Sequence, residues 1–129
     1  MILDTKFVID IINGKGDAIS KLNSFAKDGI NYSTTTVTIF ELWSGLVILN
    51  KNESHKNKIL LFLKDQIIKN LDSESAQFAG KIYGHLIKKG LEIDAEDCMI
   101  AGIAIKNNEK LATNDNNFDR IEGLRIEKY

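Results

Sequence analysis

The chain has 129 residues, of which 43% are hydrophobic and 27% charged, and its formal net charge is −1. These values fit one globular domain, residues 1–129, and they exclude nucleic-acid binding through overall charge, so such binding would need local lysines or metal ions. No apolar run approaches the roughly 20 residues of a membrane span, and we expect no membrane partner. The single cysteine, Cys98, excludes an internal disulfide, and we expect a reducing, cytoplasmic setting.

The first part of the chain alternates short apolar segments with patterns of helical spacing. Residues 1–3 are typical of a buried parallel strand, whereas 17–27 repeats apolar side chains every three or four residues, as a helix does. The β-branched and hydroxyl-bearing run 30–36 predicts a strand, and Thr36 is placed to cap the following helix. The predicted elements are a strand at 1–3, helices at 5–12 and 17–27, a strand that starts at 30 and ends near 33–35, and a helix from 36 to about 49.

The second part continues the same alternation. Residues 73–89 place apolar side chains on one face of a long amphipathic helix. Residues 94–106 are apolar nearly all round, which predicts a buried helix capped by Asp94. The predicted elements are helices at 53–63, 73–89 and 94–106, and short strands at 67–68, 110–113 and 124–126. Strands that alternate with helices indicate an α/β domain with a mostly parallel sheet.

Four acidic residues lie where an ionised carboxylate is costly. Asp4 follows the first predicted strand, and Asp115 follows the strand at 110–113. Glu41 interrupts an apolar helix, and Asp97 lies in the first turn of the predicted buried helix. Because ligand sites in parallel sheets lie at the carboxyl ends of the strands, we expect the four to converge there. Asp4 or Asp97 alone could equally be a helix cap or a surface residue, whereas the position of Glu41 inside an apolar helix favours a functional role. The joint pattern is more specific than any one of the acids.

Converging carboxylates repel one another and raise one another's pKa unless a cation compensates their charge. A hard divalent cation is the simplest compensator, since Mg²⁺ prefers oxygen ligands and usually takes one or two carboxylates directly. Such sites bind phosphate esters, activate a water and stabilise the leaving oxygen. Zinc is disfavoured because neither His55 nor His85 has a second histidine or cysteine at ligand spacing.

Sequence blocks in a fixed order surround these acids. They are Met1-Ile2-Leu3-Asp4-Thr5, then Thr36-Val37-Thr38-Ile39-Phe40-Glu41-Leu42 with Gly45, then Asp97-Cys98-Met99-Ile100-Ala101, and finally Leu111-Ala112-Thr113-Asn114-Asp115 with Asn117-Phe118 and Ile121-Glu122-Gly123-Leu124. In order and spacing they resemble the PIN domain family, and in particular the small VapC-type toxins of toxin–antitoxin pairs, over essentially the whole chain. The resemblance implies a three-layer α/β/α sandwich with a mostly parallel sheet and an endoribonuclease that depends on Mg²⁺ or Mn²⁺. It implies catalytic roles for Asp4, Glu41, Asp97 and Asp115, with Asp4, Asp97 and Asp115 as metal ligands.

Other residues near the acids are accessory candidates. Thr5, Thr113 and Asn114 could hold a water or a phosphate oxygen, and structural capping is an equal alternative. Asn117 stands where many relatives have an aspartate, so a second metal ion would bind more weakly here. Six cationic residues could contact RNA phosphates, although such residues more commonly form a solvated surface. They are Lys15, Lys21, Lys27, Lys88, Lys89 and Arg120.

Two functions of different classes are compatible with this sequence. The first is a metal-dependent ribonuclease toxin, with RNA as substrate and a cognate antitoxin protein as partner. The second is a catalytically inactive PIN scaffold that acts as a binding or regulatory module. A receiver-type phosphoacceptor domain is disfavoured because the mid-chain acid, Glu41, is a helical glutamate. We also expect a homodimer, since Trp43, Leu46 and Val47 exceed what one helix face can bury.

Overall fold

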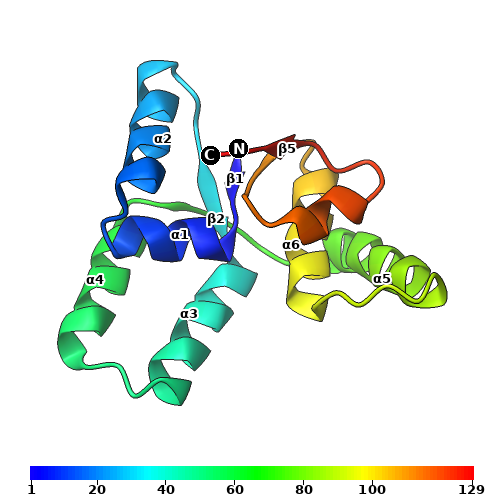
Figure 1. The fold of residues 1–129 in the computed structure, drawn as a ribbon, viewed down its shortest axis with the longest axis horizontal. Helices are drawn as coiled ribbons and strands as arrows, with labels where there is room; N and C mark the ends of the chain where they lie inside the picture. The colour runs from blue at the N-terminus through cyan, green and yellow to red at the C-terminus, as the bar shows by residue number, and fades with distance from the viewer.

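A five-stranded, fully parallel sheet with the strand order β3-β2-β1-β4-β5 forms the centre of the computed structural model, which describes residues 1–129 (Figure 1). The strands are β1 (Ile2–Leu3), β2 (Ser33–Thr35), β3 (Ile67–Lys69), β4 (Leu111–Ala112) and β5 (Ile126–Glu127). The helices are α1 (Thr5–Ile12), α2 (Gly16–Lys27), α3 (Thr36–Ile48), α4 (Glu53–Lys64), α5 (Ser73–Lys88) and α6 (Ala95–Lys106), with a short 3₁₀ helix, η1 (Asn116–Arg120). No helix is both long and apolar enough to cross a membrane.

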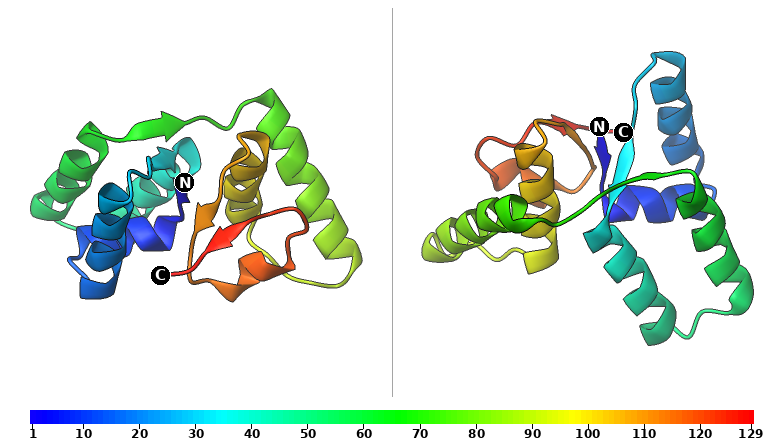
Figure 2. Two further views of the ribbon diagram at one scale, coloured as in Figure 1. Left: turned by 90° about the horizontal axis from the view of Figure 1, so that it is seen from above. Right: turned by 180° about the vertical axis from the view of Figure 1, so that it is seen from behind.

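Each face of the sheet supports its own hydrophobic core. Successive side chains of a strand point to opposite faces, so Ile2 faces one core and Leu3 the other. The Ile2 core is completed by α5, α6 and η1, and the Leu3 core by α1, α2 and α4. Helix α3 contributes Val37 to the first core and Leu42 to the second. Figure 2 shows the two groups of helices on opposite sides of the strands, which confirms the three-layer α/β/α sandwich.

Helix α6 is buried, as its apolar sequence predicts, and it packs closely against α5. Gly102 makes this approach possible, because a Cβ atom there would lie 2.5 Å from the Ser75 carbonyl oxygen and 2.9 Å from the Ala79 nitrogen. Cys98 is buried in the same helix, and burial raises the pKa of its thiol to about 11. Cys98 therefore packs as a small buried hydrophobe, and a reactive thiol is disfavoured.

The predicted cap of α3 was wrong by one residue. Thr35 is the cap, since its Oγ1 accepts a 3.0 Å hydrogen bond from the Thr38 nitrogen. Thr36 begins the helix, and its Oγ1 instead accepts from the Leu71 nitrogen at 3.1 Å. This second bond ties the start of α3 to the segment that follows β3. Asp94 has the predicted position before α6, but its side chain makes no capping hydrogen bond.

Candidate active site

Asp4 lies at the junction of β1 and α1 and is buried, with 4% of its surface exposed. Its backbone nitrogen donates to the Ala112 oxygen at 3.1 Å, so Asp4 is held beside the end of β4. Its carboxylate accepts a 2.7 Å hydrogen bond from Thr113 Oγ1. The same Thr113 hydroxyl accepts from the Asp115 nitrogen at 3.0 Å. Thr113 therefore links the two aspartates that follow neighbouring strands.

A chain of hydroxyl groups fixes Glu41. Thr5 Oγ1 donates to Glu41 Oε1 at 2.7 Å and lies 2.8 Å from Thr38 Oγ1, which in turn accepts from Thr35 Oγ1 at 3.4 Å. Because each hydroxyl has one proton to donate, Thr38 must donate to Thr5. The direction is thus Thr35 to Thr38 to Thr5 to Glu41, and such chains strengthen as each member polarises the next.

Asp97 lies in the first turn of α6, and its pKa is raised to about 7, chiefly by burial and then by the charges of Asp4 and Glu41. Burial is also the main cause that raises the pKa of Asp4 and of Glu41. The charge of Asp115 contributes to the raised pKa of both Asp4 and Asp97. The four predicted acids, from β1, α3, α6 and the end of β4, therefore lie close enough to feel one another's charge.

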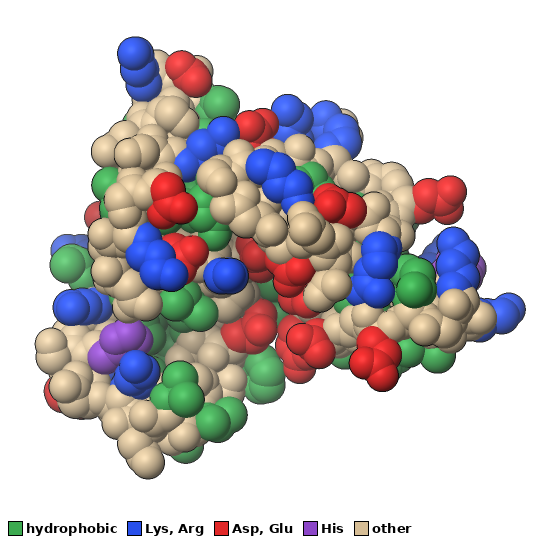
Figure 3. All heavy atoms as spheres, viewed as in Figure 1, with side chains coloured by type: hydrophobic (Ala, Val, Ile, Leu, Met, Phe, Trp, Pro, Cys, Tyr) green, Lys and Arg blue, Asp and Glu red, His purple; other side chains and the backbone are tan.

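No cation of the chain compensates this acidic site. None of the ion pairs in the structure involves Asp4, Glu41, Asp97 or Asp115. Two further acids on and before α6, Asp94 and Glu96, add to the negative charge around Glu41. Figure 3 shows Asp and Glu side chains gathered at the centre of this face, between the half that contains α1 and α3 and the half that contains α6.

The donor set fits a hard divalent cation with water among its ligands. All four site residues offer carboxylate oxygens, and their charges lack a cationic partner. No three acidic, histidine or cysteine side chains lie close enough together to enclose a metal ion by themselves. This spacing agrees with Mg²⁺, which usually keeps several waters and binds one or two carboxylates directly.

The accessory candidates divide into two groups. Thr5 and Thr113 lie in the site, where both bind its carboxylates. Asn114 is a structural residue. Its Nδ2 donates a hydrogen bond to the backbone oxygen of Tyr129 at 2.7 Å, and its Oδ1 accepts one from the backbone nitrogen of Tyr129 at 2.8 Å. Asn117 is exposed, and its backbone nitrogen donates to Asp115 Oδ1 at 2.9 Å.

Some site features do not follow from the expectations drawn from the sequence. The role of Thr38 could have been found, because it lies one helical turn before Glu41 and so shares its face. Two of the candidate RNA-contacting lysines are engaged elsewhere, Lys15 with Asp10 at 3.1 Å and Lys21 with Glu127 at 2.9 Å. Nothing in the local sequence indicates the Lys21–Glu127 pair, since its members lie more than a hundred residues apart.

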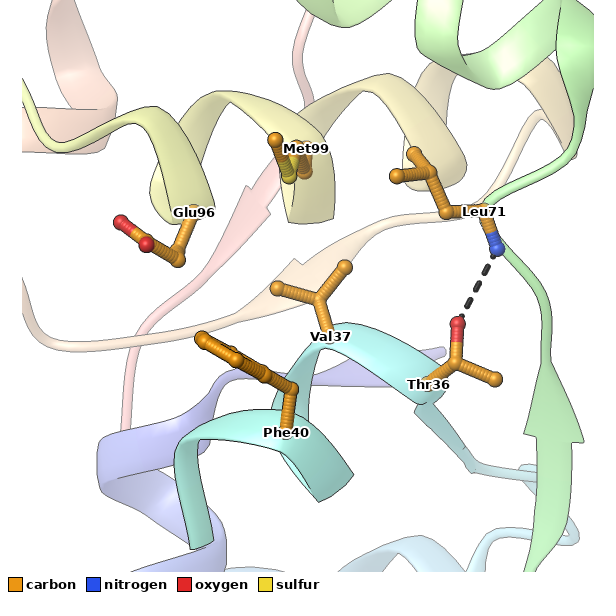
Figure 4. Close-up of a pocket in the computed structure, with 6 residues that line it drawn as sticks. All are labelled: Thr36, Val37, Phe40, Leu71, Glu96 and Met99. Carbon is orange, nitrogen blue, oxygen red and sulfur yellow. Dashed lines mark hydrogen bonds between the residues drawn. The ribbon is translucent and has the colours of Figure 1, made fainter. Parts of the chain in front are cut away.

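Two pockets adjoin the acidic site. One is a groove of about 210 Å³ between α1, α3 and α4, which is lined by Ile9, Leu46 and Ile59 and reaches Glu41. The other, of about 340 Å³, lies between α3 and α6 (Figure 4). There Phe40 and Val37 project from α3 towards α6, and Glu96 lies at the same pocket. Apolar surface therefore borders the acids on two sides.

Comparison with known proteins places this site in a family. A model of the PIN domain matches residues 1–124. The protein named Ribonuclease VapC2 of Rickettsia felis is 30% identical over 129 residues, which cover 98% of this chain and 96% of that protein. The tRNA(fMet)-specific endonuclease VapC of Salmonella typhimurium is 28% identical, with coverage of 98% and 96%.

Solved structures agree with the sequence comparisons. VapBC2 of Rickettsia felis bound to a promoter DNA fragment matches with a TM-score of 0.88 at 28% identity, covering 99% of this chain and 97% of that one. DNA-bound VapBC of Salmonella typhimurium matches with a TM-score of 0.82 at 27% identity, covering 98% and 96%. The family model, the curated relatives and the fold thus agree with the order of the acidic sequence blocks, and the chain belongs to the PIN domain family.

Proposed function

We propose that this chain is an endoribonuclease that depends on Mg²⁺ or Mn²⁺, hydrolyses RNA phosphodiester bonds and acts as the toxin of a toxin–antitoxin pair. The observation that carries the proposal is the set of four carboxylates from four elements at one edge of the sheet, none of which has a cationic partner. Burial and then the charges of neighbouring acids raise the pKa of Asp4, Glu41 and Asp97. Relatives named as VapC ribonucleases support the same activity.

Each acid has a distinct part in this proposal. Asp4, Asp97 and Asp115 would hold the divalent ion, one or two of them directly and the rest through its bound waters, and the ion would shield the phosphate, activate water and stabilise the leaving oxygen. Glu41 has one oxygen fixed by Thr5, so its second oxygen is free to accept a hydrogen bond from the attacking water. Thr113 keeps Asp4 oriented by donating to its carboxylate.

Cleavage of RNA in the presence and absence of metal tests the activity. The purified chain, free of any partner, is incubated with structured RNAs in Mg²⁺, in Mn²⁺ and in EDTA. We expect cleavage with either metal and none in EDTA. The double variant Asp4→Asn/Asp97→Asn should be inactive, whereas Asp65→Asn, which changes an exposed acid outside the site, should retain activity. Cleavage in EDTA, or by the double variant, would overturn the metal mechanism.

Thermal unfolding tests metal binding independently of activity. An ion that binds only the folded state stabilises it by mass action, by about 1–3 kcal/mol when the ion is well above its Kd. We expect Mn²⁺ to raise the melting temperature, and the rise to shrink in Asp97→Ala. An unchanged melting temperature across a Mn²⁺ titration would show that the acids form no binding site.

An antitoxin would occupy the groove between α1, α3 and α4. An amphipathic helix can lay its apolar face on Ile9, Leu46 and Ile59, and an arginine or lysine on it would then reach Glu41 at the edge of the groove. Solved VapBC complexes of similar proteins support such a partner. Expression of the chain alone should slow growth, and co-expression of its genomic neighbour should restore it.

An inactive scaffold is the second candidate. The neutral Asn117 favours it, since it stands where many relatives have an aspartate. The two candidates differ in the cleavage assay, since a scaffold binds its partner and leaves RNA intact at every metal concentration.

A further inference from the structure

A second charged pocket, of opposite sign to the acidic site, lies between α5 and the 3₁₀ helix η1. Its volume is about 230 Å³, and its cationic and histidine side chains are Lys81, His85, Lys89 and Arg120. The floor is apolar, with Ile82 among the residues that form it. Figure 3 shows Lys and Arg side chains over this part of the molecule, beside the acidic centre.

The positive charges of this pocket are not neutralised within the chain. None of the ion pairs in the structure involves Lys81, His85, Lys89 or Arg120. One acid, Glu122, also lines the pocket, but it forms no ion pair with these cations. Two lysines and an arginine therefore exceed the single carboxylate in a concave site, which favours an anionic ligand.

The side chains of the pocket are positioned by two elements, α5 and η1. Lys81, His85 and Lys89 follow one another at intervals of four residues, so they form a stripe that runs along one face of α5 to Lys89, the residue just after its end. Arg120 faces them from η1, where its Nε donates to the Asn117 oxygen at 3.2 Å and its Nη2 to the Glu92 oxygen at 2.6 Å. These backbone contacts fix the guanidinium without neutralising it, and they leave three of its five N–H groups free for a ligand.

A helix dipole does not explain this arrangement by itself. Cations are stabilised in the last turn of a helix, which accounts for Lys88 and Lys89. Lys81 lies two turns earlier, and Arg120 belongs to a different element. The pocket therefore brings together cations that local helix stability does not require.

The 3₁₀ helix connects the basic pocket with the acidic site. Asp115 caps η1 at its start and Arg120 ends it, so the two are separated by five residues, roughly 10 Å at the rise of a 3₁₀ helix. Arg120 also contacts the segment just before α6, the helix that contains Asp97. A strand of RNA whose scissile phosphate lies at the acids can thus reach the pocket within a few nucleotides.

We propose that this pocket is a phosphate-binding subsite for single-stranded RNA, in which Lys81, Lys89 and Arg120 bind the backbone a short distance from the scissile bond. The inference rests on the proposed ribonuclease function. The apolar floor offers surface for a base or ribose beside the bound phosphate, which suits single-stranded nucleic acid better than a free anion.

Equilibrium binding of RNA tests the subsite without any cleavage. The affinity of the full chain for a labelled, short single-stranded RNA is measured by fluorescence anisotropy in EDTA at salt concentrations between about 50 and 200 mM. The variant Lys89→Glu is compared with Lys88→Glu, which makes the same charge change at the neighbouring exposed residue outside the pocket. Lys89→Gln provides a neutral variant, and melting temperatures confirm that all three are folded.

We expect Lys89→Glu to weaken binding about tenfold and Lys88→Glu by less than about threefold. The slope of log affinity against log salt should fall by about 0.7 for each phosphate of a single strand that the variant no longer binds. Equal effects of the two variants, or an unchanged slope, would overturn the subsite. RNA affinity of Lys89→Glu equal to that of the wild type would also overturn it. Failure of the wild-type chain to cleave RNA with Mn²⁺ is a separate result, which contradicts the proposed function.

Discussion

Asp97 is the residue whose protonation most directly reports the charge of the site. Its carboxyl is half-buried and faces the charges of Asp4 and Glu41, so its pKa rises from 3.8 to about 7. In the metal-free protein the site therefore relieves its repulsion by holding a proton near neutral pH. A bound divalent cation would provide the same relief without the proton.

The stability of the metal-free protein should fall as the pH rises from about 4 to about 7. Between the unfolded and the folded pKa of Asp97 the folded chain binds more protons than the unfolded chain, so the free energy of unfolding decreases with pH. The expected loss is about 1–2 kcal/mol, less than the whole shift implies, because solvent partly screens a half-buried carboxyl. Denaturant unfolding in EDTA at several pH values measures it.

Asp97→Asn removes the ionisable group and supplies the control for this prediction. The variant should unfold with a flatter pH dependence and be more stable than wild type at pH 8, although Asp4 and Glu41 still contribute some slope. If the free energy of unfolding of the variant depended on pH as steeply as that of the wild type, the pH dependence could not be assigned to Asp97.

Thr5 is a positioning residue, because it acts on the site through Glu41. Thr5→Val keeps the shape of the side chain but removes the donor to Glu41 and the acceptor for Thr38. We expect RNA cleavage to fall about tenfold while RNA affinity in EDTA stays within about twofold, a loss of transition-state rather than ground-state interaction. Thr5→Ser, which retains the hydroxyl, should restore most of the rate. Equal rates for Val and Ser at this position would show that the hydroxyl chain does not position Glu41.

At the scale of elements, the close contact of α5 with α6 depends on one glycine. Gly102→Ala would place a Cβ against the backbone of α5, and overpacking of this kind costs about 1–3 kcal/mol, more than the gain in helix propensity of about 1 kcal/mol. The matched control is Gly84→Ala on α5, where an added Cβ meets nothing within 4 Å and helix propensity should stabilise the fold. Chemical denaturation should therefore give opposite signs for the two variants. The same sign for both would contradict the packing argument.

The sequence predicted the type and order of most elements, and it failed at their ends. Residues 30–36 are rich in β-branched and hydroxyl-bearing side chains, yet the strand begins only at Ser33, because the Ile30 nitrogen donates to the Phe25 oxygen and closes the end of α2. The last strand was predicted at 124–126, but it is Ile126–Glu127, since the Leu124 nitrogen bonds the Ile121 oxygen in a turn. Local propensity does not reveal these competing hydrogen bonds.

The candidate site was also predictable from the sequence only in part. Its four acids were predictable because they interrupt or border apolar elements whose carboxyl ends share one edge of a parallel sheet. The hydrogen bond from Thr5 to Glu41 and the clamp of Asn114 on Tyr129 were not, because they join residues 36 and 15 positions apart whose pairing only the folded chain defines. Polar contacts of this kind produce no periodic pattern of residue types in a sequence.

At the scale of the whole molecule, α3 exposes apolar surface on two different faces. Leu42 and Leu46 turn towards α1 and α4, where the groove proposed for the antitoxin lies. Phe40, Trp43 and Val47 are spaced by three and four residues and form a separate exposed stripe. Of the residues predicted to mark a dimer surface, Leu46 therefore belongs to the groove, and Trp43 and Val47 belong to the stripe.

We expect the stripe of Phe40, Trp43 and Val47 to be covered by a second copy of the chain, so that the protein is a homodimer. Exposed apolar surface of this kind marks protein interfaces in soluble chains, and 76% of Val47 is exposed. Val47→Glu should therefore raise the dimer dissociation constant at least about tenfold, because it places a charge in the core of the interface. Leu61→Glu, at a similarly exposed apolar residue on α4, should leave the constant unchanged.

Sedimentation equilibrium at micromolar concentration measures the dimer dissociation constant of the wild type and of both variants. A wild-type chain that sediments only as the 14.5 kDa monomer would refute the homodimer, and equal weakening by the two variants would refute the stripe as its interface.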